Sequence, residues 1–406
     1  MVELNLDAPF STKIKILGVG GAGGNAVNSM INAGITGVEY IVANTDAQDL
    51  RKSFANTKIH LGSKITKGLG AGADPEKGKL AAEESLDEIE EILADTNMLF
   101  IAAGMGGGTG TGAAPVIAKK AKEMGVLTLG IVSLPFDFEG LKRKSNASRG
   151  IQEIQDIVDT LIVIPNNKIS KIYGKVSFLE AFKKADDIIT NAAQAIADII
   201  NRSGYVNVDF ADVKAVMTDM GYALMGIGVA EGDDRAVNAA RNAIANPLLS
   251  DIELSGCKAL LINVTAGYDL MMDEFDQINQ VITNETGQSG NIVSGLIMDE
   301  NMQGSIKVTL IATGLSPSDA VKSLPIDSLN VKTDTPKPPL QLHIKKKEEQ
   351  ESEFLEIQKR IQNANQTEAV QPTPKTYHNQ EFNKGEPPAF MKKYYNWYYY
   401  FYKGDF

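Results

Sequence analysis

The sequence has a single cysteine, Cys257, and only three histidines among its 406 residues. One cysteine excludes a disulfide framework, and its place before the apolar run Ala259–Val264 favours a small buried residue over a nucleophile. His343 and His378 lie in a low-complexity C-terminal stretch, which leaves His60 alone in the globular part. Catalytic triads that use histidine and zinc sites built from several histidines are therefore nearly excluded.

Long apolar runs and positive charge are also scarce. No stretch approaches the roughly 18 apolar residues of a membrane-spanning helix, and the N-terminus shows no signal-peptide pattern. The 40 Lys and Arg against 51 Asp and Glu give a net charge of −11, which argues against nucleic acid as the main partner. We expect a soluble cytoplasmic protein with no transmembrane segment, long enough for two domains and a tail.

Glycine, by contrast, is concentrated at one place. The segment Ala103–Gly112 holds six glycines and two threonines between an apolar run, Met98–Ala102, and a helical pattern over Gly112–Met124. Glycines let backbone N–H groups approach a ligand, and a helix N-terminus favours negative charge. Thr109 and Thr111 add hydroxyl donors. No lysine follows, so the segment predicts a phosphate-binding loop that is not of the Walker type, and its position between a strand and a helix disfavours a flexible linker.

A second glycine segment, Gly18–Gly23, has the G-x-G-x-x-G spacing of dinucleotide-binding proteins. An NAD-dependent oxidoreductase is therefore an alternative. That class needs an acidic residue at the end of the second strand, Val38–Ala43, and Asp46 lies somewhat late for this role. Asp46 is equally compatible with a plain N-cap of a helix at Ala47–Ser53. Two phosphate-binding segments suit a triphosphate held by several loops better than a dinucleotide.

Strand and helix patterns alternate along the first half of the chain, which predicts a parallel sheet covered by helices on both faces. The expected strands are Lys13–Gly18, Val38–Ala43, Met98–Ala102, Val126–Ser133 and Leu161–Ile164. The expected helices are one that ends near Ala33, one at Pro75–Leu93 and one at Gly112–Met124.

The longest helical pattern begins at Ser177, where Glu180 completes a capping box, and ends at Gly204. Apolar residues recur along it with helical spacing: Leu179, Phe182, Ile188, Ile189, Ala192, Ala193, Ile196, Ile199 and Ile200. Roughly 26 residues at about 1.5 Å each predict a rod of about 40 Å, near the diameter of a domain.

A second, smaller α/β region is expected after Gly221, ending near Gly314. Its predicted strands are Tyr222–Ala230, Ala259–Ala266, Asn291–Met298 and Ser305–Thr313, and its predicted helices are Arg235–Asn246 and Met272–Asn284. From Ser316 onward the chain is rich in Pro, Lys, Glu and Gln, which predicts a disordered linker with a span of roughly 45 Å.

Four segments together carry a family resemblance: Gly106–Gly112, Gly18–Asn25, Asn44–Asp46 and Asn207–Val213. Over about residues 12–314 the chain resembles the FtsZ family, the tubulin-like cell-division GTPases of bacteria. The resemblance implies an α/β fold with a parallel-sheet GTP-binding domain of tubulin type, a long central helix and a second α/β domain. It also implies GTP and GDP as ligands, and head-to-tail filaments that form the division ring at mid-cell.

We accordingly expect six parts in the chain: a GTP-binding domain at 1–176, the central helix at 177–203, an acidic catalytic loop with its helix at 204–221, a C-terminal activation domain at 222–315, a disordered linker at 316–385 and a partner-binding tail at 386–406.

The resemblance also implies individual nucleotide contacts. In the glycine segments these are Gly20, Gly21, Gly24, Asn25, Gly104, Gly107, Gly108, Thr109 and Gly110; Asn44 and Asp46 belong to the matching Asn-Thr-Asp segment. It places Glu139 and Arg143 near the ribose and phosphates, and Asn166 near the base. From the residues alone, Glu139 and Arg143 are an i,i+4 pair on a solvated helix face. Mg²⁺ is expected on the phosphates and water, with no protein ligand.

Phe182 and Asp186 are four residues apart on the long helix and therefore share one face. The ring can cover the plane of a base, and the carboxylate can accept hydrogen bonds from guanine N1–H and its 2-amino group. The alternative is a core phenylalanine beside a solvated aspartate. With the family resemblance, the pair predicts a guanine site.

Asn207, Asp209 and Asp212 are the catalytic candidates. Structurally, Asp209 fits an N-cap for a helix at Phe210–Met220. Functionally, two carboxylates can orient a water for attack on the γ-phosphate. Phe182 and Ser203 are separated by a helical rise of about 30 Å, so the acidic loop cannot reach a nucleotide bound at the helix start of its own subunit. It is expected to act on the neighbour's nucleotide in a head-to-tail filament.

The tail segment 386–393 resembles the peptide that binds membrane-tethering and regulatory division proteins in this family. The aromatic-rich extension Tyr394–Phe406 has no counterpart in that pattern. A GTP-binding filament scaffold with little hydrolysis stays open as an alternative function, with the NAD-dependent enzyme more distant.

Overall fold

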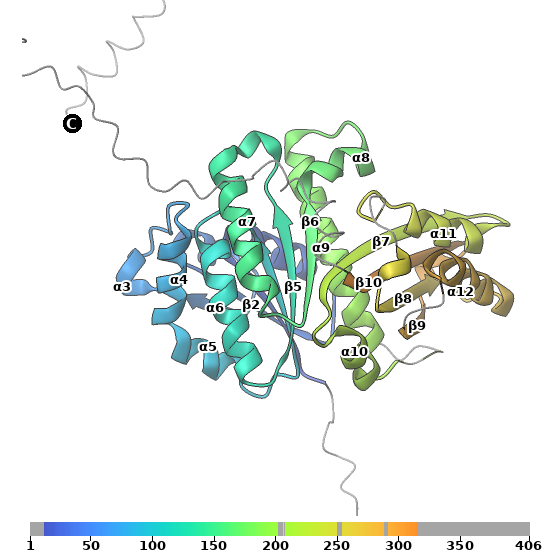
Figure 1. Cartoon of the computed structure of the whole chain (residues 1–406), viewed down its shortest axis with the longest axis horizontal. Helices are drawn as coiled ribbons and strands as arrows, with labels where there is room; N and C mark the ends of the chain where they lie inside the picture. Colours follow the sequence, from blue (N-terminus) through green and yellow to red (C-terminus); the bar gives the residue numbers. More distant parts are fainter. Residues whose placement is uncertain (1–11, 202–205, 207, 250–253, 288–290, 316–406) are drawn as a thin grey trace, which may run out of the picture. The chain divides into compact units, whose positions relative to one another are not determined.

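Ten strands form one hydrogen-bonded sheet in the computed structural model, which describes residues 12–201, 206, 208–249, 254–287 and 291–315 (Figure 1). The strands are β1 (Ile14–Val19), β2 (Val38–Asn44), β3 (Thr57–His60), β4 (Met98–Gly104), β5 (Leu127–Leu134), β6 (Thr160–Pro165), β7 (Gly221–Glu231), β8 (Ala259–Ala266), β9 (Asn291–Met298) and β10 (Ser305–Leu315). Their spatial order is β3-β2-β1-β4-β5-β6-β7-β10-β8-β9. Neighbours from β3 to β7 are parallel, which confirms the parallel sheet predicted for β1, β2, β4, β5 and β6 and extends it to β3 and β7. Strand β10 runs antiparallel to β7 and β8.

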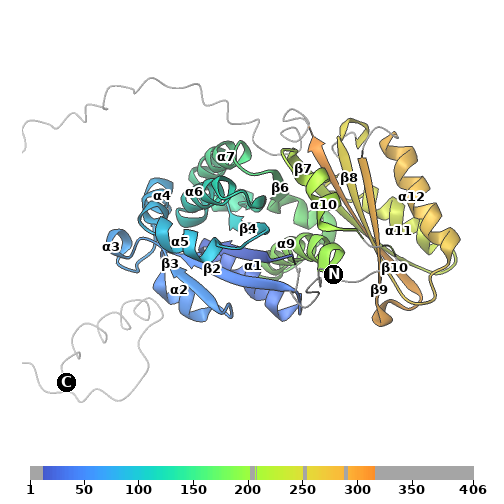
Figure 2. The same ribbon diagram turned by 90° about the horizontal axis from the view of Figure 1, so that it is seen from below.

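Helices cover both faces of this sheet. They are α1 (Gly20–Asn32), α2 (Ala47–Lys52), α3 (Ser63–Thr66), α4 (Pro75–Glu84), α5 (Leu86–Leu93), α6 (Thr109–Glu123), α7 (Leu141–Gln155), α8 (Ile169–Tyr173), α9 (Phe178–Asn201), α10 (Phe210–Met217), α11 (Arg235–Ile244) and α12 (Met272–Thr286). One core joins α4–α7, α11 and α12 to the sheet, and a second joins α1, α9 and α10 to its other face (Figure 2). Strands such as β5 are buried along their whole length, because an apolar run without alternation needs cover on both sides.

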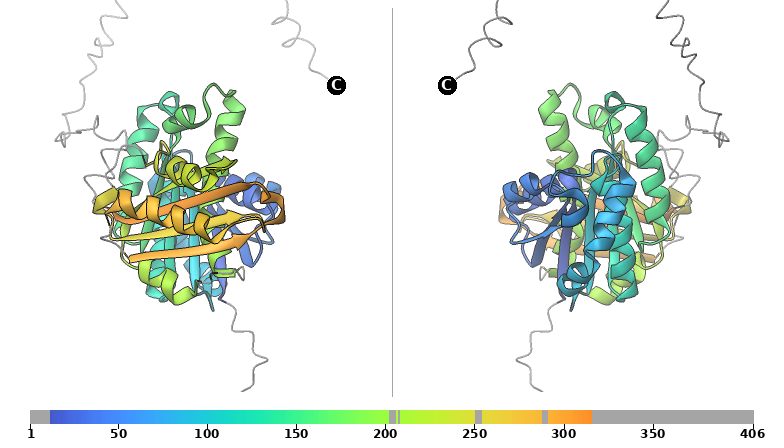
Figure 3. Two further views of the ribbon diagram at one scale, coloured as in Figure 1. Left: turned by 90° about the vertical axis from the view of Figure 1, so that its right-hand side faces the viewer. Right: turned by 90° about the vertical axis from the view of Figure 1, so that its left-hand side faces the viewer.

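The second region holds β7, β10, β8 and β9, with α11 and α12 packed together (Figure 3). The fold thus has two α/β domains, as expected. The expected strands and helices of this region are all present within two residues of their predicted ends. Cys257 is buried, as predicted, and burial raises the pKa of its thiol. Within the described residues, none of the helices combines the length and apolarity needed to span a bilayer.

The long helix α9 links the two domains. Its capping box is confirmed, because Ser177 N donates to Glu180 Oε2 at 2.9 Å and Glu180 N donates to Ser177 Oγ at 3.3 Å. The helix contacts β5 and β6 in the first domain and β8 and β9 in the second. The prediction that Leu179 belongs to the apolar face of this helix is wrong, since Leu179 lies in the first turn and is 80% exposed.

Several predicted elements need correction. The single helix at Pro75–Leu93 is wrong: α4 and α5 are separated at Ser85, whose Oγ accepts a hydrogen bond from Gly62 N. Strand β3 and helix α7 were not predicted, since β3 has four residues and α7 begins with a run of polar side chains. Helix α6 starts at Thr109, three residues before the expected start, so part of the glycine segment is helical.

Some predictions fall outside the described residues. These are the helix stop at Gly204, the candidate Asn207, the linker at 316–385, the tail at 386–393 and the extension Tyr394–Phe406. The six domain limits stay predictions.

Candidate nucleotide site

A cavity of about 330 Å³ opens at the carboxyl ends of the parallel strands. Its lining includes Gly20, Gly21, Gly104, Gly107, Gly108, Thr109, Gly110, Glu139, Arg143, Asn166, Phe182 and Asp186, all of them predicted site residues. Strand β1 has β2 on one side and β4 on the other. The chain therefore adds strands outward from β1 in one direction up to β3 and in the opposite direction from β4 onward. Ligands of parallel α/β folds bind at such a point.

Two helix N-termini meet at this cavity. Helix α1 begins at Gly20 and α6 at Thr109, and no side chain caps either of them. A Cβ added at Gly20 would lie 2.9 Å from Gly110 N, and Gly20 has a φ of +73°, so glycine is required at this contact. The uncapped first-turn N–H groups and the two helix dipoles favour an anion between them.

The loop after β4 is shaped by its own side chains. Gly106 has a φ of +111°, and its N–H donates to Thr111 Oγ1 at 2.8 Å. Thr111 is 1% exposed, so its hydroxyl holds the loop and does not face the ligand; the expectation that it supplies a donor to phosphate is wrong. At Gly107, by contrast, an added Cβ would meet no atom within 4 Å.

Glu139 and Arg143 form the wall beside these loops. Glu139 ends a short 3₁₀ turn, Asp137–Glu139, whereas Arg143 lies in α7, with Gly140 between the two elements. Arg143 Nη1 is 2.5 Å from Glu139 Oε2, and Phe136 N donates to Glu139 Oε1 at 2.9 Å. The interpretation as one solvated helix face is therefore wrong, because the Glu139 side chain is 12% exposed and belongs to the cavity.

Aromatic rings gather at the other end of the cavity. The ring of Phe182 lies 5.0 Å from that of buried Phe136 and 5.1 Å from that of Phe178, and Phe138 stacks on Phe136 at 5.1 Å. Phe138 and Phe178 are both more than half exposed. The cluster gives this end a broad apolar surface of the kind that covers the plane of a base.

Two polar side chains, Asp186 and Asn166, line the cavity together with Phe182. Burial raises the pKa of Asp186 to about 7, with a further contribution from the charge of Asp187. Asn166 is 6% exposed, and its Oδ1 has no hydrogen-bond partner in the described structure. A carboxyl with a strongly shifted pKa and a buried amide oxygen without a partner in the described structure indicate a binding site.

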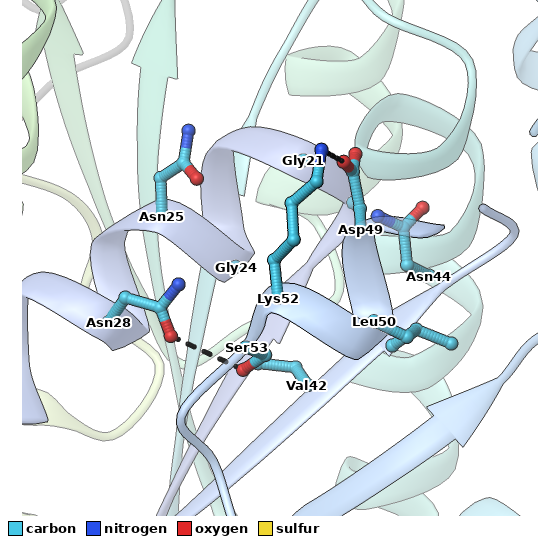
Figure 4. A pocket seen from close by; sticks show the side chains of 11 residues that line it. Gly21, Gly24, Asn25, Asn28, Val42, Asn44, Asp49, Leu50, Lys52 and Ser53 are labelled. Carbon is cyan, nitrogen blue, oxygen red and sulfur yellow. Dashed lines mark hydrogen bonds and ion pairs between the residues drawn. The ribbon is translucent and has the colours of Figure 1, made fainter. Parts of the chain in front are cut away.

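A smaller cavity of about 40 Å³ shares Gly20 and Gly21 with the first. Figure 4 shows the residues that line this smaller cavity. It contains the predicted residues Gly24, Asn25 and Asn44.

Asp46 lines neither cavity. It caps α2, since its Oδ1 accepts from Gln48 N at 2.8 Å. The N-cap alternative thus describes Asp46 here, and a nucleotide contact by Asp46 stays a prediction.

Asp209 and Asp212 lie at the start of α10, away from the cavity. Asp209 is the N-cap of α10, with its Oδ1 accepting from Asp212 N at 2.8 Å, and both side chains are exposed. The C-terminal end of α10 is bonded to the amino end of β6, because Thr160 Oγ1 donates to Met217 O. The structure therefore brings the cavity residues together and leaves Asp209 and Asp212 apart from them.

Sequence reasoning missed one polar residue that lines the cavity and one that lies behind it. Ser133, near the end of β5, lines the cavity, and Thr45, just after β2, bonds to Thr109. Their positions at the carboxyl ends of parallel strands next to the glycine segments were the signal that pointed to them.

The carboxylates of the cavity are not arranged as a metal site. Both oxygens of Glu139 have partners, and within the described residues no three His, Cys, Asp or Glu side chains converge as ligands. This donor set fits a magnesium ion held by phosphate oxygens and water.

The strand order β3-β2-β1-β4-β5-β6 also occurs in dinucleotide-binding enzymes, so topology alone does not decide the function. Comparisons with known proteins decide between the two functions. Residues 13–174 match the model of the GTPase domain of the Tubulin/FtsZ family, and residues 221–316 match the C-terminal domain of the FtsZ family. These matches rule out the NAD-dependent oxidoreductase.

Similarity to individual proteins supports the same family. The chain is 50% identical over 322 residues to the cell division protein FtsZ of Buchnera aphidicola subsp. Baizongia pistaciae, covering 79% of this chain and 83% of that one. It is 49% identical over 316 residues to that of Coxiella burnetii, covering 78% and 82%. A solved structure, an empty FtsZ dimer from M. jannaschii, matches with a TM-score of 0.72 at 41% identity, over 75% of this chain and 88% of that chain.

Proposed function

The chain belongs to the FtsZ family of tubulin-like GTPases, and from this membership we propose that the larger cavity binds GTP and GDP in one orientation. The phosphates lie against the N-termini of α1 and α6, the ribose beside Glu139 and Arg143, and guanine between Phe182, Asp186 and Asn166. The observation that carries this assignment is the pairing of two uncapped helix N-termini at one end of the cavity with a partly buried carboxyl at the other.

Hydrolysis is proposed to take place between subunits. About 19 residues of α9 separate Phe182 from the far end of the helix at Asn201, a rise of about 29 Å. Asp209 and Asp212 follow that end of the helix in the chain, and both are exposed. Their helix, α10, is hydrogen-bonded to the amino end of β6. They cannot reach the nucleotide of their own subunit, but they can reach that of the next subunit stacked on the cavity edge.

Such a contact joins two different surfaces of identical subunits, so it repeats and builds a filament. We propose that this filament forms the division ring at mid-cell. Within each contact, the carboxylates of Asp209 and Asp212 orient a water toward the γ-phosphate, and the helix N-termini stabilise the negative charge that develops on the phosphate oxygens. Asn207 belongs to the same loop and is proposed to assist them. Mg²⁺ on the phosphates would neutralise part of their charge.

Asp186→Asn should weaken GTP binding by about tenfold or more and narrow the preference for GTP over ATP, because a charged acceptor of the guanine donors is lost. The wild-type affinity should rise between about pH 6 and pH 8. With a pKa of about 7, Asp186 is largely protonated in the free protein at pH 6, and GTP binding requires it to release that proton. The variant should lose this pH dependence. Calorimetric titrations with GTP and ATP across this range measure both effects.

Asp187→Asn is the matched control. Asp187 is the adjacent carboxylate, it pairs with Lys184 at 3.5 Å, and its charge helps to raise the pKa of Asp186. Its loss should move the midpoint of the pH profile to lower pH and leave GTP affinity at pH 8 unchanged. Equal discrimination between GTP and ATP in wild type and Asp186→Asn would instead assign base recognition to another group, such as Asn166.

The tail segment 386–393 is proposed to bind membrane-tethering and regulatory division proteins. Deleting residues 386–406 should leave GTP hydrolysis and filament formation unchanged, because a linker of about 70 residues separates the tail from the catalytic domains. The same deletion should abolish recruitment to vesicles that carry a tether protein. Co-sedimentation of the full chain and the truncated chain with such vesicles measures this. Loss of polymerisation on truncation would contradict the proposal.

A further inference from the structure

A buried threonine lies directly behind a hydroxyl group that lines the cavity. Thr45 Oγ1 and Thr109 Oγ1 are 2.6 Å apart, a distance typical of an O–H···O hydrogen bond, and either atom can be the donor. Thr45 follows β2 and is fully buried, whereas Thr109 opens α6 and lines the cavity. The bond therefore ties the end of one strand to the helix N-terminus that faces the ligand.

The number of hydrogens restricts how this pair can work. Each hydroxyl has one hydrogen to donate and lone pairs that accept. A phosphate oxygen in the cavity can only accept, so Thr109 must turn its single hydrogen toward the ligand. The oxygen of Thr109 is then free to accept from Thr45, and Thr45 has to be the donor within the pair.

We propose that Thr45 is a positioning residue of the nucleotide site: its hydroxyl donates to Thr109 Oγ1 and thereby directs the hydrogen of Thr109 toward a phosphate oxygen of the bound nucleotide. The inference rests on the proposed function, because it requires a phosphate group at the glycine end of the cavity. Thr45 itself does not line the cavity, so its effect on the ligand passes through Thr109.

The surroundings of Thr45 hold its hydroxyl in place. Its backbone carbonyl accepts from Thr66 Oγ1 at 3.3 Å and from Gly70 N at 3.2 Å, which fixes the backbone at this residue. A rigid supporting group is what a donor needs in order to orient a second hydroxyl. Thr128, another fully buried threonine of the sheet, differs because its hydroxyl donates to the carbonyl of Val126, which can only accept.

Thr45→Val removes the hydroxyl and keeps the shape of the side chain. It should weaken GTP and GDP binding by about five- to tenfold, the effect of one lost hydrogen bond, and leave the affinity for guanosine unchanged. Thr45→Ser should restore wild-type affinity for all three ligands. Thr128→Val removes a buried hydroxyl near the amino end of β5, far from the cavity at the carboxyl ends of the strands, and should change none of the three affinities. Should Thr45→Val not fold, Thr45→Ala is compared with Thr45→Ser in the same way.

A double variant shows whether Thr45 acts through Thr109. In a Thr109→Val background, adding Thr45→Val should cause no further loss of GTP affinity, because the group that it orients is already missing. The proposal is overturned if the losses of GTP affinity in the two single variants add up in the double variant. It is also overturned if Thr45→Val weakens the binding of guanosine as much as the binding of GTP, since both results indicate a general structural role. Wild-type protein that binds guanosine as tightly as GTP would instead overturn the assignment of a phosphate site itself.

Discussion

Asp212→Ala should lower the rate of GTP hydrolysis by about a hundredfold or more while GTP affinity stays within about twofold of wild type. The reason is that a group which orients water acts in the transition state, whereas the proposed nucleotide site is the cavity at the carboxyl ends of the parallel strands. Phosphate release at several protein concentrations measures the rate, and calorimetric titration measures the affinity. Equal loss of affinity and rate would mean that the acidic loop belongs to the pocket of its own subunit.

Asp209 needs a different variant, because its side chain caps α10. Asp209→Ala would also remove the cap, at a cost of about 1 kcal/mol, whereas Asp209→Asn keeps a good cap and removes the charge. We expect Asp209→Asn to lose hydrolysis without losing stability.

Asp87→Ala is the matched control for Asp212→Ala, since Asp87 is also an exposed acid in the first turn of a helix. It should hydrolyse GTP at the wild-type rate. Hydrolysis by wild type that does not depend on protein concentration would favour the scaffold alternative or a site within one subunit.

Gly112→Ala should destabilise the fold by roughly 3 kcal/mol or more. Helices α4 and α6 pack against each other at glycines, and a Cβ at Gly112 would lie 1.9 Å from Pro75 O and 2.7 Å from Lys79 N. These are backbone atoms of α4, so the two helices would have to separate, and that displacement would disturb the loop that precedes α6. Thermal or urea unfolding of the nucleotide-free protein measures the loss.

Gly24→Ala provides the comparison within a helix. Gly24 lies in α1, and a Cβ there would meet no atom within 4 Å. The substitution should keep the stability or raise it by about 0.5–1 kcal/mol, because alanine loses less backbone entropy than glycine on folding. If both variants lost the same stability, close packing of α4 on α6 would not be the cause.

Local patterns were sufficient for the parts of the site that lie on one segment. The glycines at Gly104–Gly110 and Gly20–Gly24 predict a phosphate site by composition alone, and the structure places Gly20, Gly21, Gly104, Gly107, Gly108 and Gly110 in one cavity. The spacing of Phe182 and Asp186 puts both on one face of a helix, and the structure places both in the cavity. The resemblance to the family added Glu139, Arg143 and Asn166, which have no distinctive pattern of their own.

Contacts between distant segments were beyond the reach of local patterns. The partnership of Thr45 with Thr109 depends on the adjacency of β2, β1 and the start of α6, and the lining role of Ser133 depends on the pairing of β4 with β5. Thr111 was assigned wrongly for the same reason: composition shows a hydroxyl near glycines, but only the folded loop shows that it is turned inward to Gly106. The break at Ser85 likewise depends on a contact with Gly62, far away in the sequence.

The most direct test of the account mixes two inactive proteins. Asp212→Ala has an intact cavity and a defective loop. Gly107→Asp has an intact loop and a charge that repels phosphate from the cavity, at a position where an added Cβ meets no atom within 4 Å. Hydrolysis between subunits predicts that each variant alone is inactive and that an equal mixture with GTP regains activity. About one in four randomly formed contacts then combines a good cavity with a good loop. A mixture that assembles and stays as inactive as its components would contradict the claim that each acidic loop acts on the neighbour's nucleotide.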